Sequence, residues 1–276
     1  MKIIRFITED EKIAWGTDWD GDTASRLEGD VFVNLTDTGQ RLTVKHVLPV
    51  VWASAIICIG LNYRGHAEEI GFELPEYPAV FMKNPGAITG HMAPVVIPDC
   101  CANSPEVDFE AELGVVIKKP AKNLSEDQAL EYVAGYTCAN DVSARRWQKH
   151  AGAGQWVKGK SFDTFCPCGP VMVTPDEITD PQNLEIQCRV NGEVMQKSHT
   201  GDMIFSVARI ISYLSQSCTL MPGTLILTGT PEGVGYTRKP PVYLSPGDRV
   251  ETEIQGIGVL ENPVVAERKS SEPREV

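Results

Sequence analysis

The chain has no hydrophobic run long enough to span a membrane comfortably. Its most apolar stretch, residues 47–61, contains Pro49 and is short for a transmembrane helix, so we expect a core element there. The first residues, Met1 to Glu9, turn polar before the apolar region of a secretory signal could form. These features predict a soluble cytoplasmic protein.

Positive charge is also scarce. The 276 residues carry a formal net charge of −12, which disfavours nucleic acid and anionic membranes as partners, although a local cationic pocket can still bind a small acid. With 42% hydrophobic residues the chain can bury a large core. We expect a small β-rich region at 1–54, a main domain at 55–266 and a flexible charged tail at 267–276.

Signatures of zinc and nucleotide binding are missing. The eight cysteines are sparse and lack the paired spacing of a zinc site, which favours reduced, buried thiols. The glycine-rich loop, residues 228–235, has no Gly-Lys-Ser/Thr, and Pro231 interrupts a dinucleotide fingerprint. Backbone amides in such a loop can still bind a carboxylate.

Short alternating segments separated by Gly, Asn and Asp indicate a predominantly β, α+β protein. Asn191-Gly192 is typical of a β-hairpin turn. Asp202 is expected to cap a helix over Met203–Ser215. Other expected strands include Lys2–Thr8, Lys12–Gly16, Asp30–Leu35, Ala55–Gly60, Ala79–Lys83, Gly135–Ala139 and Arg249–Ile254.

The segment Val107–Ile117 carries alternating acids. In a continuous strand Asp108, Glu110 and Glu112 would share one face, where like charges repel unless water or a cation surrounds them. Two interpretations remain open, a strand with one solvated face or a metal site. Asp141 is a third candidate ligand, and it can equally cap the helix that follows it.

A possible general base lies just after the apolar run that ends at Gly60. If residues 61–70 are helical, His66 and Glu69 share a face at i, i+3, and a carboxylate beside an imidazole can fix its tautomer. The alternative is a solvated helix start with incidental charges. The loop after this helix, Gly71–Tyr77, is a candidate lid over a substrate.

Several cations and amides are candidates for contacting an acidic ligand. Lys83 ends an apolar strand and either reaches the surface or points into a cavity. Lys158 and Lys160, if they lie in a strand, share a face that is either solvated or balances the acidic segment. Arg145 and Gln148, if helical, share a face at i, i+3 and can reach one ligand.

Together these segments resemble the fumarylacetoacetate hydrolase family, in particular its smaller acylpyruvase and isomerase-like members. The resemblance rests on Gly60–Glu69, Phe81–Lys83, Asp108–Ile117, Asn140–Gln148, Gly159–Thr164 and Leu227–Gly235, in the family's order. It implies a mixed β-roll, usually homodimeric, and a role in aromatic catabolism. It also implies a metal held by Glu110, Glu112 and Asp141, catalysis by His66, Glu69 and Lys160, and substrate contacts from Lys83, Arg145, Gln148 and Thr230.

The activity implied first is Mg²⁺-dependent hydrolysis, with Mn²⁺ as a substitute, of a C–C bond in an acylpyruvate-like 1,3-diketo acid. Water activated by His66 would attack the distal carbonyl, and the metal and Lys160 would stabilise the enolate that leaves. The alternatives are isomerisation of 2-hydroxy-dienedioates or decarboxylation of oxaloacetate at the same site. A non-catalytic protein that binds a small 2-oxo acid is the more distant alternative.

Overall fold

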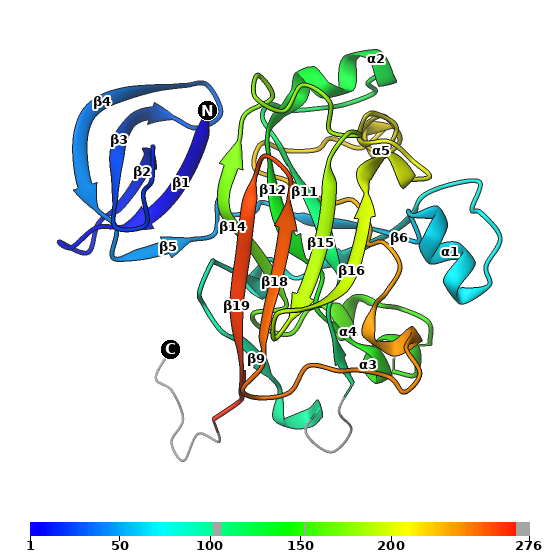
Figure 1. Ribbon diagram of the computed structural model, residues 1–276. Coiled ribbons are helices and arrows are strands. Elements are labelled where there is room, and N and C mark those ends of the chain that lie inside the picture. The colour runs from blue at the N-terminus through cyan, green and yellow to red at the C-terminus, as the bar shows by residue number, and fades with distance from the viewer. Residues whose placement is uncertain (102–105, 152, 269–276) are drawn as a thin grey trace.

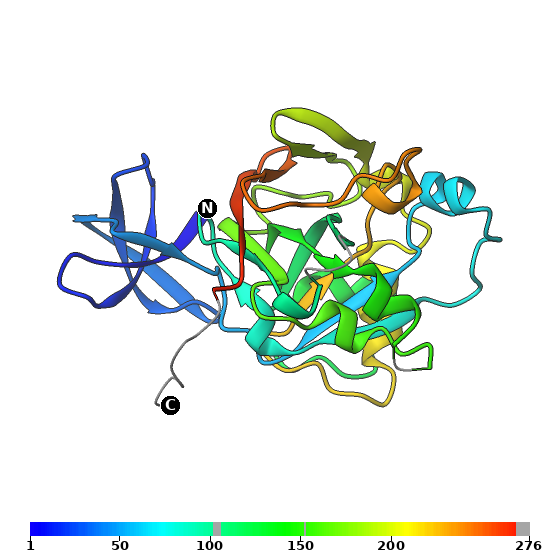
Figure 2. The ribbon, with the colours of Figure 1, turned by 90° about the horizontal axis from the view of Figure 1, so that it is seen from below.

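A computed structural model describes residues 1–101, 106–151 and 153–268 of the chain (Figure 1). Its first part is a small antiparallel β unit, set to one side of the molecule in both ribbon views (Figures 1 and 2). The strands of this unit are β1 (Lys2–Ile7), β2 (Ile13–Thr17), β3 (Thr23–Asp30), β4 (Asn34–Thr43) and β5 (His46–Leu48).

One predicted strand in this unit is wrong. Asp30–Leu35 contains the turn between β3 and β4, where the Asp30 carboxylate accepts the Phe32 amide at 2.8 Å and the Asp30 carbonyl accepts the Val33 amide at 3.0 Å. This local pattern competes with strand pairing. The predicted small N-terminal β-rich appendage is nevertheless confirmed.

The appendage continues into the main sheet because β1 pairs with β14 (Cys166–Val173). From there the order is β14, β12 (Val133–Asn140), β11 (Ala111–Ile117), β17 (Leu225–Leu227), β6 (Ile56–Gly60) and β7 (Ala79–Lys83). Every residue of β11 and β12 is buried, as expected of central strands covered on both faces. β17 and β6 pair in parallel, whereas β11 and β12 are antiparallel, so the sheet is mixed.

A second sheet packs over the first, and its strands lie in front of β11 and β12 in Figure 1. The predicted Asn191-Gly192 hairpin is confirmed as the turn between β15 and β16. The two sheets enclose the core and form the predicted mixed β-roll. The second sheet has the order β16 (Glu193–His199), β15 (Glu185–Val190), β18 (Arg249–Ile254), β19 (Gly258–Ala266) and β9 (Val95–Ile97).

Short helices lie around the sheets: α1 (Arg64–Ile70), α2 (Glu126–Ala129), α3 (Arg145–Lys149), α4 (Val157–Lys160) and α5 (Val207–Ser215). The predicted start of the last helix is wrong. Ser206, not Asp202, caps α5 by accepting the Arg209 amide at 3.1 Å, while Asp202 accepts the Gly65 amide at 3.0 Å and so fixes the start of α1. The short strands are β8 (Ile88–Thr89), β10 (Val107–Asp108) and β13 (Ser143–Ala144), and the 3₁₀ turns span 85–87, 99–101, 130–132, 200–202 and 235–237.

Two further strand predictions are wrong where they concern the site. The acidic segment is not continuous, because the Glu110 amide donates to the Asn140 side chain at 3.0 Å instead of to a strand partner, which separates β10 from β11. Lys158 and Lys160 lie in α4 instead of a strand. Lys158 is exposed and Lys160 is buried, so they share no face. The end of the tail, residues 269–276, lies outside the described residues.

Candidate active site

Three carboxylates meet beside the centre of the main sheet. Glu110 directly precedes β11, Glu112 is the second residue of that strand and Asp141 follows β12, and one oxygen from each lies within 4.8 Å of the others. All three side chains are buried, which rules out a solvated acidic face. Asp141 does not cap α3 either, since both of its oxygens contact lysines. The fold thus brings together the three residues predicted as metal ligands.

Buried cations surround these carboxylates. Lys160 Nζ lies 2.7 Å from both Glu110 Oε2 and Asp141 Oδ2. Lys83 contacts the other oxygen of Asp141 and donates to the Val142 carbonyl at 3.1 Å. Lys83 therefore lies behind the carboxylates and does not line the cavity, in contrast to its predicted place beside the substrate.

Arg145 links the metal-ligand candidates to the remaining acid of the segment. Its guanidinium lies 2.7 Å from Glu110 Oε1 and 2.7 Å from Asp108 Oδ2, and it also donates to the Gln148 side chain at 3.1 Å. Asp108 in turn accepts the amides of Gly235 and Tyr236 at 2.7 and 3.1 Å. Asp108 therefore positions Arg145 and is separated in role from Glu110 and Glu112, although the sequence groups the three.

The electrostatics of the cluster favour a bound cation. Burial disfavours the charged form of Glu110, but Lys160 and Arg145 outweigh this effect and hold its pKa well below the ordinary value. Burial and the neighbouring Asp141 and Glu110 raise the pKa of Glu112 well above its usual range. In this cluster of described residues, four buried carboxylates face three cations: Asp108, Glu110, Glu112 and Asp141 against Lys83, Arg145 and Lys160.

The donor set fits a hard divalent metal ion. The ligand atoms are all carboxylate oxygens, the kind that Mg²⁺ and Mn²⁺ prefer, and no thiol or imidazole is grouped with them among the described residues. Burial and the neighbouring carboxylates Asp141 and Glu110 disfavour the charged form of Glu112, and a divalent ion bound beside it would favour that form. The residues present therefore fit the group that the sequence predicted.

A second functional pair lies on α1. His66 Nδ1 is 3.0 Å from Glu69 Oε2, and the other oxygen of Glu69 accepts the Gly233 amide at 3.0 Å and the Thr237 hydroxyl at 2.8 Å. Burial tends to raise the pKa of Glu69, but the hydrogen bonds from His66, Thr237 and Gly233 hold it below its ordinary value. An ionised Glu69 accepts a hydrogen bond from Nδ1–H of His66, which leaves the lone pair on Nε2 available.

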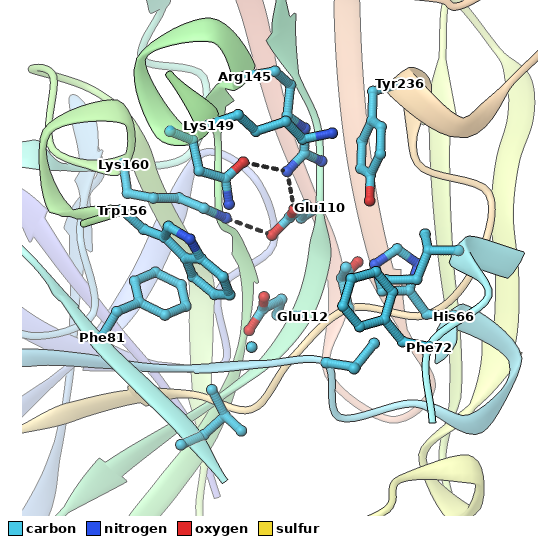
Figure 3. A pocket seen from close by; sticks show the side chains of 16 residues that line it. His66, Phe72, Phe81, Glu110, Glu112, Arg145, Lys149, Trp156, Lys160 and Tyr236 are labelled. Atoms are coloured by element: carbon cyan, nitrogen blue, oxygen red, sulfur yellow. Dashed lines mark hydrogen bonds and ion pairs between the residues drawn. The ribbon is translucent and has the colours of Figure 1, made fainter. Parts of the chain in front are cut away.

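His66 of this pair and the carboxylates Glu110 and Glu112 line one cavity of about 270 Å³ (Figure 3). His66 and Phe72 lie on one side of it, Glu110 and Glu112 in the middle, and Lys160, Trp156 and Phe81 on the opposite side. Gln148 and Thr230 also line it, as predicted for substrate contacts, while Glu69 and Asp141 support residues of the wall. The volume suits a small ligand.

Sequence patterns missed several residues of this wall. Phe72, Trp156, Tyr236 and Lys149 come from four separate segments, and no spacing connects them. Phe72 alone has a partial signal in the sequence, because it belongs to the loop 71–77, the candidate lid over a substrate. The glycine-rich loop does bind carboxylates through its amides, as predicted, but they are the protein's own.

A mixed β-roll that carries a buried carboxylate triad beside a His-Glu pair is the arrangement of an enzyme with a candidate site for a divalent metal ion. Residues 55–265 match the family model described as fumarylacetoacetate (FAA) hydrolase C-terminal, and residues 1–47 match the Rv2993c-like N-terminal model. The chain belongs to the fumarylacetoacetate hydrolase family, and it is an enzyme of that family.

Known proteins are similar over most of the chain. Oxaloacetate tautomerase FAHD2A, mitochondrial, from Bos taurus is 48% identical over 225 residues, which cover 82% of this chain and 71% of the relative. The solved 2-hydroxyhepta-2,4-diene-1,7-dioate isomerase from Mycobacterium marinum has a TM-score of 0.83 and 38% identity, covering 98% of this chain and all of that one. The solved 5-carboxymethyl-2-hydroxymuconate delta-isomerase from Mycobacterium smegmatis has a TM-score of 0.84 and 36% identity, covering 97% of this chain and all of that one.

The comparisons also bear on location. The name of the Bos taurus relative gives a mitochondrial location for that protein, which does not match the plain cytoplasmic location predicted from the sequence. Over the described residues, none of the helices has the length and apolar character that crossing a bilayer requires.

Proposed function

We propose that this enzyme interconverts the keto and enol forms of a small 2-oxo acid, and that shifting the double bond of a 2-hydroxydienoate is the same chemistry on a longer chain. The observation that carries the proposal is the placement of His66 and of the carboxylates Glu110 and Glu112 on facing parts of one small cavity (Figure 3). A base on one side and a metal site on the other are the two requirements of enolisation.

Glu110, Glu112 and Asp141 are the residues that would hold a Mg²⁺ or Mn²⁺ ion. When bound, such an ion acts as a Lewis acid that draws electron density from the carboxylate and 2-oxo oxygens of the substrate and makes the neighbouring C–H more acidic. Lys160, buried beside Glu110 and Asp141, adds fixed positive charge at the same place. Gln148 and Thr230 are proposed to orient the substrate.

The proton is moved by His66. With Nδ1 bound to Glu69, Nε2 takes a proton from the carbon next to the 2-oxo group, and Glu69 stabilises the imidazolium that results. The proton then returns to the substrate oxygen, which gives the enol, or to a more distant carbon, which gives the shifted double bond. No leaving group or water is needed, so both directions use the same two residues.

Hydrolysis of an acylpyruvate, the main reaction predicted from the sequence, is the second candidate. His66 and Glu69 are equally suited to deprotonating a water, which supports it. It also requires a water placed on the distal carbonyl, and the similar proteins described above are named as a tautomerase and isomerases. Oxaloacetate decarboxylation stays a candidate because breaking the C3–C4 bond releases CO₂ and leaves the enolate of pyruvate, whose negative charge lies on the same 2-oxo oxygen.

The test is NMR of the purified protein with Mg²⁺ in D₂O, offered oxaloacetate, a 2-hydroxydienedioate and an acylpyruvate in separate tubes. We expect deuterium at C3 of oxaloacetate or a shifted double bond, and a loss of about 10²–10⁴-fold in this rate for His66→Ala, which removes the proton acceptor. His46→Ala, an exposed histidine of β5, is the matched control. Cleavage of the acylpyruvate without any exchange would select hydrolysis instead.

A Mg²⁺ requirement and a homodimer are parts of the same proposal, and both are directly measurable. Chelation followed by readdition of Mg²⁺ or Mn²⁺ should abolish and restore turnover. Light scattering should give twice the chain mass of 30.2 kDa.

A further inference from the structure

The cationic groups deep in the cavity are already paired with protein carboxylates. Arg145 binds Asp108 and Glu110, and Lys160 binds Glu110 and Asp141. A substrate that brings one carboxylate to the metal site can be balanced there. A second carboxylate on the same substrate needs a further cation on the cavity wall, because burying an unpaired charge is costly.

Lys149, at the end of α3, is such a cation. It lines the cavity, and no ion pair joins it to a carboxylate in the part of the chain that the structure describes. Its Nζ lies 3.6 Å from the centre of the Tyr236 ring, and the Arg145 guanidinium lies 4.4 Å from the same centre. Burial and the nearby Arg145 lower the pKa of Lys149, which marks a place where an added anion would be stabilised.

The surroundings of Lys149 differ from the rest of the wall. Ile59, Ile70 and Phe72 also line the cavity and offer no partner for a carboxylate, and His66 is already bound to Glu69. Beyond Lys149 an outer cavity of about 490 Å³ continues past Arg146 and His150, with Glu106 as the acid among its lining residues. Lys149 lines both cavities, and therefore lies between the inner cavity and the basic residues of the outer one.

We propose that Lys149 binds the carboxylate at the far end of the substrate, and that this residue makes the site prefer substrates with two carboxylates over substrates with one. The proposal rests on the function proposed above and specifies the substrate class of that same site. Lys149 is a specificity-determining residue and not a catalytic one, because it binds the far carboxylate and takes no part in moving the proton. Tyr236 holds the ammonium in place through its ring face.

The experiment measures binding with a pair of stable ligands that differ by one carboxylate. Lactate and malate share the 2-hydroxy acid end that replaces the 2-oxo acid, and only malate carries a second carboxylate. Calorimetry of the full chain with Mg²⁺ gives the ratio of their dissociation constants. We expect the wild-type protein to bind malate about tenfold more tightly, which corresponds to about 1.4 kcal/mol.

The variants isolate the contribution of Lys149. Lys149→Met should reduce the preference for malate to less than about twofold, while Lys149→Arg, which keeps the charge, should retain most of it. Lys158→Met, at an exposed lysine of the neighbouring α4 outside the cavity wall, is the matched control and should retain the wild-type ratio. Equal melting temperatures would show that all variants fold.

Two results would overturn the assignment, namely a wild-type ratio near one or an unchanged ratio in Lys149→Met. Failure of the proposed function is recognised separately, by measuring deuterium exchange into oxaloacetate with the same wild-type preparation. A preference for malate that depends on Lys149, without exchange, keeps the specificity residue and refutes the reaction. Exchange with no dependence of the ratio on Lys149 keeps the reaction and refutes the specificity residue.

Discussion

Replacing Glu112 by Gln should stabilise the metal-free protein and abolish its response to Mg²⁺. In the folded chain Glu112 is a buried carboxylate beside two others, and its own contact is with a backbone amide, Gly229 N at 2.7 Å. A glutamine has the same shape, and its side-chain oxygen can still accept that amide. The substitution therefore keeps this side chain neutral without the uptake of a proton and leaves the packing intact.

The size of the effect follows from the spacing of the oxygens. Two unit charges 4.8 Å apart repel each other by about 3.5 kcal/mol at an effective dielectric constant of about 20. Glu112 has two such neighbours, Glu110 and Asp141. Lys160 lies between them and offsets about one of these repulsions, and partial protonation of Glu112 relieves more. We expect a net stabilisation of about 2 kcal/mol, or about 4–8 °C in melting temperature for a chain of this size.

Thermal unfolding in a chelator and in Mg²⁺ tests both halves of this prediction. The wild-type protein should gain about 2.7 kcal/mol when Mg²⁺ is present at a hundred times its dissociation constant, whereas Glu112→Gln should gain much less. Glu193→Gln, at an exposed glutamate of β16, is the control and should behave as the wild type in both buffers. The interpretation of these carboxylates as a metal site fails if the variant is less stable in chelator, or if Mg²⁺ stabilises it as much as the wild type.

Three further substitutions test other parts of the site. Glu69→Gln should reduce the loss of unfolding free energy at acid pH. Folding lowers the pKa of Glu69 from 4.5, so its carboxylate stabilises the protein above that pH and this contribution is lost as the pH falls below it. Urea unfolding at several pH values would measure the difference. Gly60→Ala places a Cβ 2.5 Å from the Trp156 ring, so we expect a loss of about 1–3 kcal/mol and a higher KM in steady-state kinetics. Asp108→Asn removes the charged partner of the buried Arg145 guanidinium and should lower the free energy of unfolding by about 3–5 kcal/mol, measured with denaturant. A much smaller loss would show that this ion pair contributes little to stability.

The parts of the site that the sequence predicted are those set by local order along the chain. The apolar run that ends at Gly60 became β6, and the i, i+3 spacing of His66 and Glu69 on α1 was enough to pair them. Strand alternation predicted that Glu110 and Glu112 share a face, and the structure brings both side chains into one buried cluster. In each case neighbours in sequence are neighbours in space.

The errors come from contacts between distant segments. Alternation failed at Asp108 because the side chain of Asn140, the last residue of β12, accepts a hydrogen bond from the Glu110 amide and interrupts the strand there. The sequence does not indicate a role for Lys149, because that role depends on residues distant in sequence. These are Tyr236, whose ring contacts the ammonium, and the residues from other segments that complete the cavity wall. Sequence periodicity carries no information about such meetings.

The glycine-rich loop explains how the two sides of the cavity are held in one geometry. Its amides bind carboxylates with different roles: Gly229 holds the metal-ligand candidate Glu112, Gly233 holds Glu69 of the base pair, and Gly235 holds Asp108, which positions the arginine. A Cβ on Gly235 would lie 1.8 Å from a backbone carbonyl, so this close approach requires glycine. One segment thus holds the partner of His66, one carboxylate of the buried cluster and the acid that positions Arg145. These contacts set the spacing between the two sides of the cavity without a ligand, which is the preorganisation that the proposed enolisation needs.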